Sequence, residues 1–283
     1  MKLTLSVDRT ADLTDEMYEK YNLKTINMWI NNIKIAGDTF RDSEVSAQDI
    51  YDAAEVRNLV PKTSAALESE YRELFESSTT DGGSIIHFSI GDKLSASHAN
   101  AKRASQGLER VYVIDSKSVS VGTGLLAIKA HEMQQSGLPV EEIVKKCTEI
   151  AEKIDVSFII NDLKFLHRGG RVSGLKLLGA NLLKIRPTLY IDHEGRLIPG
   201  KKFKGQFKKC VEEYADMKIS QTQNVDKKIA MIASTVGTDE ALAKYITNEL
   251  KKAGFENIME FKVGVTITTH CGRNTLGLVF LNN

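Results

Sequence analysis

The sequence has little cysteine, no long apolar run and almost no net charge. Its three cysteines, Cys147, Cys210 and Cys271, are an odd number without metal-ligand spacing, which favours a reducing compartment over a disulfide framework. No run of about 18 apolar residues occurs, so we expect no membrane-spanning segment. The first apolar stretch, Leu3–Val7, is far too short for a signal peptide. These absences predict a cytoplasmic protein that does not insert stably into membranes.

The net charge of +1 gives no general electrostatic reason to expect binding to nucleic acid or to a membrane surface. The 42% hydrophobic and 27% charged residues are typical of a globular protein and argue against disorder. A chain of 283 residues exceeds the usual size of one domain, about 100 to 200 residues, and contains no internal repeat. We therefore expect two globular domains.

The first half alternates strand and helix patterns. Ile85–Ser89 and Val111–Asp115 are short apolar runs typical of buried parallel strands, and a helical pattern over Ser120–Gln135 follows the second. Lys24–Ile30 and Ile33–Ile35 flank two asparagines, which indicates a hairpin. Alternating strands and helices predict an α/β/α domain with a parallel sheet, covering residues 1–155.

The second half has a different pattern. Strand patterns at Val156–Ile160 and Leu276–Leu281 are combined with a hairpin-like turn at His193–Arg196. Helical patterns cover Gln206–Ile219 and Glu240–Ala253. This arrangement predicts an α+β domain with a mostly antiparallel sheet, covering residues 156–283.

Hydroxyl residues stand at two predicted turns. Thr63 and Ser64 follow a proline that fixes the backbone, and such a turn can bind a carboxylate or phosphate. Ser95 and Ser97 lie near the start of a helix predicted from about Ala96 to Gln106, whose first N–H groups favour an anion. Ordinary capping turns would use the same residue types, so both interpretations stay open.

Two segments resemble catalytic motifs only in part. The turn after the first strand begins with Asp8, as in aspartyl phosphotransferases, but Thr10 occupies the position of their second carboxylate, which favours a simple turn. His270 and Cys271 are adjacent; in a strand they would point to opposite faces and could not act as a nucleophile–base pair.

The sequence Gly169-Gly170-Arg171 is the strongest local signal. Two glycines permit unusual backbone geometry, and the arginine offers a fork that fits phosphate or carboxylate. Between positions 161 and 210 there are twelve basic and only three acidic residues. Such a run is usually a solvated face. The other interpretations are a docking surface for an acidic partner, a site for a nucleotide phosphate and, less favoured because aromatic residues are few, nucleic acid.

The ordered set of motifs resembles the DegV family over essentially the whole chain. The segments that carry the resemblance are Asp8–Leu13, Thr63–Ser64, Ile86–His87 leading to Leu94–Ser95, Val113–Ser116 with Gly122 and Gly124, Asp162–Ser173, Leu183–Pro187, Gly195 with the basic stretch after it, and His270–Gly272.

The resemblance implies a fatty-acid-binding subunit that works with a bacterial fatty acid kinase and has no catalytic activity alone. One acyl chain would occupy a tunnel between the two domains, with no metal or other cofactor. Its carboxylate would be held at Thr63, Ser64 and Ser95, with His270 close by, and the kinase would phosphorylate it to an acyl phosphate for phospholipid synthesis. Arg171 and Lys204 would serve the partner and phosphoryl transfer.

The chain departs from the family pattern at five positions. Arg9 replaces a small hydroxyl residue, Ala65 and Ala66 replace a Gln-Pro pair, Ala96 replaces glycine and Lys204 replaces arginine. Two alternatives to the kinase-partner function remain. One is a serine-dependent acyl hydrolase using Ser95 and His270, which lacks the glycines of a nucleophile elbow. The other is a lipid-responsive regulator.

Overall fold

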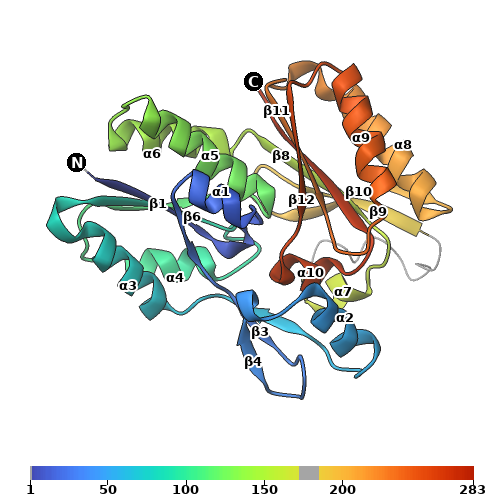
Figure 1. The fold of residues 1–283 in the computed structure, drawn as a ribbon, viewed down its shortest axis with the longest axis horizontal. Helices are drawn as coiled ribbons and strands as arrows, with labels where there is room; N and C mark the ends of the chain where they lie inside the picture. Colours follow the sequence, from blue (N-terminus) through green and yellow to red (C-terminus); the bar gives the residue numbers. More distant parts are fainter. Residues whose placement is uncertain (1, 172–184) are drawn as a thin grey trace.

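The computed structural model describes residues 2–171 and 185–283 and contains two main sheets (Figure 1). The first sheet has the strand order β2-β1-β6-β7, and all its neighbouring strands are parallel. Its strands are β1 (Leu3–Asp8), β2 (Leu23–Ile26), β6 (Ser84–Ser89) and β7 (Val111–Asp115). This arrangement confirms the parallel sheet predicted for the first half.

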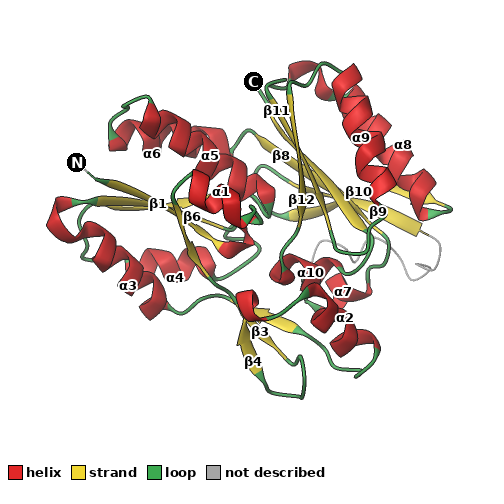
Figure 2. Ribbon diagram, in the orientation of Figure 1, coloured by secondary structure: helices red, strands yellow, loops and turns green. Residues whose placement is uncertain are grey.

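Helices cover both faces of the first sheet (Figure 2). One face carries α1 (Asp15–Lys20), α5 (Val121–Gln135) and α6 (Val140–Ala151), and the other carries α3 (Glu68–Thr79) and α4 (Ser97–Ala104). Tyr71 and Phe75 of α3 pack with Ile85 of the sheet, while Leu125 and Ile128 of α5 pack on the opposite face. Strands buried on both faces explain the nearly continuous apolar runs in the sequence.

A third, small sheet extends from the first half. It consists of β3 (Trp29–Asn31) between β4 (Thr39–Arg41) and β5 (Lys62–Ser64), and α2 (Ala47–Glu55) follows β4. The hairpin predicted between Lys24–Ile30 and Ile33–Ile35 is wrong: the first segment is divided between β2 and β3, and β3 pairs with β4 instead. The Asp38 carboxylate accepts the backbone N–H groups of residues 33, 34 and 35 at 2.7, 2.7 and 3.1 Å, which holds this segment as a loop.

The second sheet has the strand order β10-β9-β8-β13-β11-β12. Its strands are β8 (Ile154–Ile160), β9 (Ile185–Ile191), β10 (Leu197–Lys204), β11 (Ile229–Ser234), β12 (Asn257–Lys262) and β13 (Thr275–Leu281). β11 and β12 are parallel and the other neighbouring pairs are antiparallel, which confirms the mostly antiparallel sheet. Helices α8 (Phe207–Ser220) and α9 (Glu240–Lys252) cover one face.

The other face of the second sheet packs against the first half of the chain. Leu5 and Val7 of β1 share one hydrophobic cluster with Met231 of β11 and Val279 of β13. Helices α7 (Lys164–Arg168) and α10 (Val265–Cys271) lie where the halves meet (Figure 1). Short 3₁₀ helices are η1 (Arg9–Ala11), η2 (Asp42–Glu44), η3 (Thr80–Gly82) and η5 (Thr222–Asn224).

Among the described residues, every helix is too short or too polar to span a membrane.

The segment before Gly272 is helical, contrary to the strand considered for His270 and Cys271. Its residues Val265-Thr266-Ile267-Thr268-Thr269 are β-branched, which favours a strand locally. Contacts from the first half override that preference. The Gly264 N–H donates to Asp12 Oδ1 at 2.9 Å, and Thr266 Oγ1 donates to Asp42 Oδ2 at 3.1 Å. Both bonds fix the start of α10.

Candidate functional site

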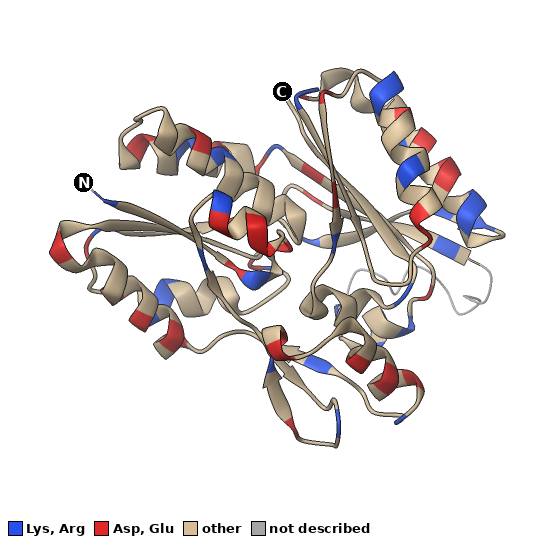
Figure 3. Ribbon diagram, in the orientation of Figure 1, with Lys and Arg blue, Asp and Glu red and all other residues tan. Residues whose placement is uncertain are grey.

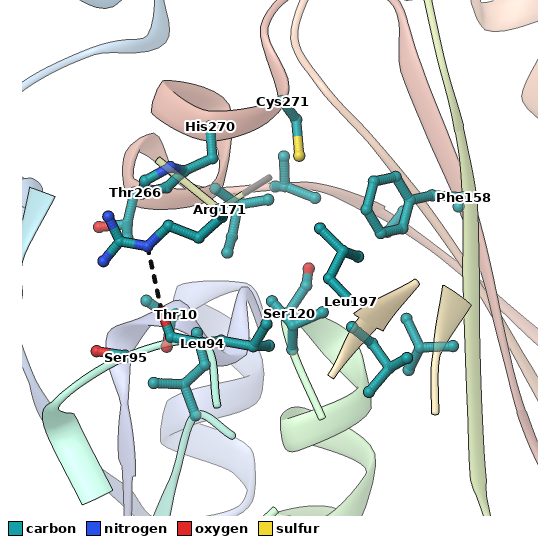
Figure 4. A pocket seen from close by; sticks show the side chains of 18 of the residues that line it. Thr10, Leu94, Ser95, Ser120, Phe158, Arg171, Leu197, Thr266, His270 and Cys271 are labelled. Carbon is teal, nitrogen blue, oxygen red and sulfur yellow. Dashed lines mark hydrogen bonds between the residues drawn. The ribbon is translucent and has the colours of Figure 1, made fainter. Parts of the chain in front are cut away.

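A cavity of about 390 Å³ lies between the two halves of the chain (Figure 4). That volume is within the usual range for a small-molecule site. Ser95, Arg171 and His270 lie at one end, while Phe158 and Leu197 lie toward the other. Most of the remaining wall is aliphatic, including Leu94, Val119 and residues of β8, β11 and β13. The cavity is therefore a mainly apolar space with one polar end.

Thr63 and His270 meet at this polar end. Thr63 lies on β5 and His270 on α10, which packs on β5, so residues 207 positions apart come into contact. Thr63 Oγ1 and His270 Nε2 are 2.8 Å apart and both residues line the cavity. The structure thus joins one hydroxyl from the first half with one imidazole from the second.

Gly169 leaves the space in which the His270 ring lies. A Cβ atom at Gly169 would overlap His270 Nδ1 and would be 2.9 Å from Cε1. His270 Nδ1 is buried and has no hydrogen-bond partner among the described residues. Burial, together with the nearby positive charge of Arg171, lowers the pKa of His270 to about 4. The imidazole is therefore neutral at pH 7.

Ser95 approaches the cavity just before α4. Its Oγ accepts the backbone N–H of Ser97 at 3.2 Å and is 2.9 Å from Ser97 Oγ. It is partly buried and lines the cavity, as does the more exposed Ser64, whose Oγ accepts an N–H of Asn31 at 3.3 Å. Thr63, Ser64, Ser95 and His270 thus all line one cavity.

Arg171 crosses from the second half to the first. Its Nε donates to the Leu94 carbonyl at 3.3 Å, drawn as a dashed line in Figure 4, and its Nη1 donates to the Gly169 carbonyl at 2.8 Å. Among the described residues, nothing is bonded to Nη2. Partial burial lowers the pKa of Arg171 from its usual value, but the group stays charged at neutral pH. The structure places this arginine at the cavity wall.

Lys204 lies apart from the cavity, at the end of the edge strand β10, and is exposed. Exposed Lys208 and Lys209 follow on α8 (Figure 3). This outer surface also carries the acidic residues of α8, so it is less one-sided than the sequence run. Val172, Ser173, Lys176, Leu183 and Lys184 of the predicted motifs and basic run lie outside the described residues.

The departures from the family pattern fall in different places. Ala65 and Ala96 line the cavity, next to Thr63–Ser64 and Ser95. Ala66 is buried against α3 and α4, and Arg9 pairs with Asp15 at 3.0 Å. Two of the replaced positions therefore belong to the cavity wall.

The geometry does not form the pair that a serine hydrolase needs. Ser95 is bonded to Ser97 and His270 to Thr63, and the described residues contain no Ser95–His270 hydrogen bond. No acid orients His270 Nδ1 there, and an imidazole with a pKa of about 4 is a poor general base at pH 7. The alternative hydrolase function lacks structural support.

Six hydroxyl residues of the wall were not among the predicted site residues: Thr10, Ser120, Ser157, Thr235, Thr266 and Thr275. Thr10 is 2% exposed and its Oγ1 has no described partner. Ser120 has φ of 56° and donates to Asp12 Oδ2 at 2.5 Å, and Thr266 donates to Asp42. The turn from Asp8 to Asp12 singles out Thr10 in the sequence. The comparison with aspartyl phosphotransferases treats Thr10 as a missing carboxylate, and so it does not predict that Thr10 lines the cavity.

The chain matches the family model described as an uncharacterised protein of the DegV family over residues 2–283. This chain belongs to the DegV family. A curated relative from Thermotoga maritima, named a fatty acid-binding protein, is 29% identical over 98% of this chain and 96% of its own.

Solved structures of DegV proteins have the same fold as this chain. A DegV family protein of Thermus thermophilus, described for its fatty acid binding, superposes with a TM-score of 0.88 at 24% identity and covers 100% of both chains. A DegV lipid-binding protein of Thermotoga maritima has a TM-score of 0.82 at 28% identity, covering 100% of this chain and 99% of its own. DegV relatives thus bind fatty acids in this fold.

Proposed function

We propose that this protein binds one long-chain fatty acid and presents its carboxylate to a partner fatty acid kinase in the cytoplasm. The observation that carries the proposal is the apolar cavity with Thr63, Ser95 and neutral His270 at its polar end. Fatty acid binding by DegV relatives supports it. In this proposal residues 1–155 supply most of the head-group contacts, and residues 156–283 cover the acyl chain.

The hydrogen bonds at the polar end allow the Thr63 and Ser95 hydroxyls to donate their protons to a carboxylate. An ionised carboxylate only accepts, so Thr63 must donate to it. His270 then donates from Nε2–H to Thr63 Oγ1, which assigns the tautomer with Nδ1 unprotonated. Either hydroxyl can donate in the 2.9 Å contact between Ser95 Oγ and Ser97 Oγ; if Ser97 donates there in place of its 3.6 Å contact with Met28 Sδ, the Ser95 proton is free for the carboxylate. Two neutral hydroxyls would thus hold the head group.

The acyl tail supplies most of the affinity. Each buried CH₂ contributes about 0.8 kcal/mol, so a chain of about 16 carbons needs little from its head group. Neutral donors leave negative charge on the carboxylate, which then attacks the γ-phosphorus of ATP. The P–O bond to ADP breaks, and the products are an acyl phosphate and ADP. The kinase partner supplies the catalytic groups, and this chain only positions the nucleophile.

Arg171 is proposed to face the phosphoryl group. Two of its nitrogens are used by backbone carbonyls, which orients the guanidinium. The Nη2 group would bind a phosphate oxygen, for which guanidinium geometry is well suited. Exposed Lys204 would contribute to docking of the kinase.

Two assays on the same preparations test this function. Palmitate and oleate binding is measured by titration calorimetry, and acyl phosphate is trapped with hydroxylamine after addition of ATP and a fatty acid kinase catalytic subunit. Wild type is expected to bind and to support hydroxamate formation. Binding of neither acid would overturn the proposal, and binding without transfer would restrict it to lipid sensing.

Arg171→Ala separates binding from transfer. We expect it to bind palmitate almost as tightly as wild type but to abolish hydroxamate formation, because the head group is held by Thr63 and Ser95. Lys145→Ala, at an exposed lysine of α6 in the other half of the chain, is the control for loss of one surface charge. A large loss of palmitate affinity in Arg171→Ala would instead assign the arginine to the head-group site.

A further inference from the structure

Asp8, the first residue of the Asp8–Leu13 motif, is a buried carboxylate that the proposed fatty acid site does not use. It ends β1 and is not among the described residues that line the cavity. Its Oδ1 accepts the Tyr71 hydroxyl of α3 at 2.7 Å, and its Oδ2 accepts the backbone N–H of Ile90 at 2.9 Å. A carboxylate is costly to bury unless donors satisfy it. Since Ile90 follows β6 and lines the cavity, one of the two bonds leads directly to the site.

His87 lies beside Asp8 on the same face of the first sheet. Register places His87 opposite Ser6, and Asp8 is two residues after Ser6 on β1. His87 Nε2 is 3.4 Å from Asp8 Oδ1 without a hydrogen bond, and Nδ1 is 3.0 Å from Ser6 Oγ. Because the Ser6 hydroxyl can donate to Nδ1 or accept from it, either tautomer of His87 has a partner there. The imidazole can therefore present a donor or an acceptor to position 8.

The Ile90 N–H begins a loop, residues 90–96, that carries two groups of the polar end. The Leu94 and Ser95 N–H groups both donate to the Gly91 carbonyl, at 3.0 and 3.3 Å, so the loop folds around Gly91. Gly91 directly follows Ile90 in the chain. The bond from Ile90 to the buried carboxylate therefore fixes the point from which both Leu94 and Ser95 are held.

We propose that Asp8 is a positioning residue for the head-group site and acts through the loop of residues 90–96. Its bond to the start of the loop fixes the place from which the Ser95 hydroxyl reaches the carboxylate of the fatty acid. The same loop presents the Leu94 carbonyl that accepts Arg171 Nε. One buried side chain thus orients both a group that holds the ligand and the arginine proposed for phosphoryl transfer. The inference rests on the proposed function and adds a residue outside the cavity to it.

A double-mutant cycle between positions 8 and 95 tests this role. Asp8→Ala should lower palmitate affinity at least about fivefold, the usual net value of one hydrogen bond. Asp8→Ala/Ser95→Ala should bind no more weakly than Asp8→Ala alone, because Ser95 no longer reaches the carboxylate once the loop is released. Titration calorimetry measures the four proteins. Losses that multiply, or an unchanged affinity in folded Asp8→Ala, would overturn the proposal.

Asp8→Asn is the conservative variant that should rescue binding. Its amide oxygen accepts the Ile90 N–H, while its NH₂ group faces the Tyr71 oxygen and His87 Nε2, both of which can accept. Palmitate affinity should therefore stay within about twofold of wild type, since the loop needs only one acceptor. A role of Asp8 through its negative charge would not be rescued, so equal losses in Asp8→Asn and Asp8→Ala would contradict positioning through Ile90.

Ser6→Ala is the matched control in the same buried cluster. It removes the partner of His87 but leaves the bond between Asp8 and Ile90 intact, so palmitate affinity should equal that of wild type. A loss as large as in Asp8→Ala would show that the cluster as a whole, and not the Ile90 bond, determines affinity, and would also overturn the proposal.

Thermal unfolding of the lipid-free proteins checks that each variant folds. If Asp8→Ala does not fold, amide hydrogen exchange of wild type supplies the test. The Ile90 N–H should then exchange as slowly as the amides of β6, and fast exchange at Ile90 would overturn the proposal. A wild-type protein that binds no palmitate would instead refute the proposed function itself, so the two failures are distinguishable.

Discussion

Ser95 is expected to contribute one neutral hydrogen bond to the head group. Replacing it with alanine removes the hydroxyl and the acceptor for Ser97, and should weaken palmitate binding by about 1 kcal/mol, the usual net value of one bond. Titration calorimetry measures the change, and Ser77→Ala on the exposed part of α3 is the control. An unchanged affinity would remove Ser95 from the head-group contacts.

Gly169 is expected to affect fatty acid affinity because the His270 ring packs against it. In Gly169→Ala the new methyl group would overlap His270 Nδ1, so the ring must move away from Thr63. Since Thr63 then loses its donor, palmitate affinity should fall by about 1 kcal/mol or more. The neighbouring control is Gly170→Asn, because a Cβ atom there meets no atom within 4 Å and asparagine tolerates its φ of 72°.

The same titration distinguishes the two glycine variants. Equal affinity losses in Gly169→Ala and Gly170→Asn would show that loop geometry, and not the His270 ring, determines binding. Loss confined to Gly169→Ala is the expected result.

Helix α10 depends on buried carboxylates of the first half. Burial raises the pKa of Asp12 to about 7, although hydrogen bonds from Ser120 and the Gly264 N–H and the charge of Arg9 oppose the shift. Asp42 lies close enough to raise it further. In the unfolded chain the same group ionises near 3.8, so the folded state holds a proton that the unfolded state has lost.

Asp12→Asn therefore has a predicted dependence on pH. The ionised Asp12 destabilises the fold increasingly as pH rises from about 4 to about 7, and the effect is constant above that range. The variant should gain stability over wild type by roughly 1–3 kcal/mol at pH 7 and almost none at pH 4. Urea unfolding across this range measures the difference. Asp81→Asn, at an exposed aspartate with similar positive φ, is the control for replacing a carboxylate with an amide in this backbone conformation.

A gain in Asp12→Asn that does not change with pH would contradict this account of α10. The amide would then act through its hydrogen bonds alone, since its oxygen can accept from the Gly264 N–H as Asp12 Oδ1 does, and its NH₂ can donate to Ser120 Oγ where Ser120 now donates to Asp12 Oδ2.

Long, regular patterns predicted most of the architecture of the whole molecule. The apolar runs at Ile85–Ser89 and Val111–Asp115 identified parallel strands, and the hairpin turns of the second half identified the antiparallel sheet. The division at residue 155 remains a prediction. It falls on the second residue of β8, while the two halves share a hydrophobic cluster.

Short or locally ambiguous segments could not be predicted. Strands β3, β4 and β5 are only three residues each, too short for a periodic pattern. Helix α10 is built from β-branched residues and forms because of contacts made by Asp12 and Asp42, more than 200 positions away. The Thr63–His270 contact likewise joins residues far apart in the sequence. The family resemblance pointed to both residues, but only the structure shows that they are hydrogen-bonded.

Native mass spectrometry of the purified chain with increasing palmitate tests the central claim most directly. The cavity predicts one adduct that saturates at a single fatty acid per protein, and a longer lifetime for palmitate than for shorter acids. Ligand binding should also raise the unfolding temperature as the free acid exceeds its dissociation constant. The absence of any adduct, or successive addition of several acids without saturation at one, would contradict the account.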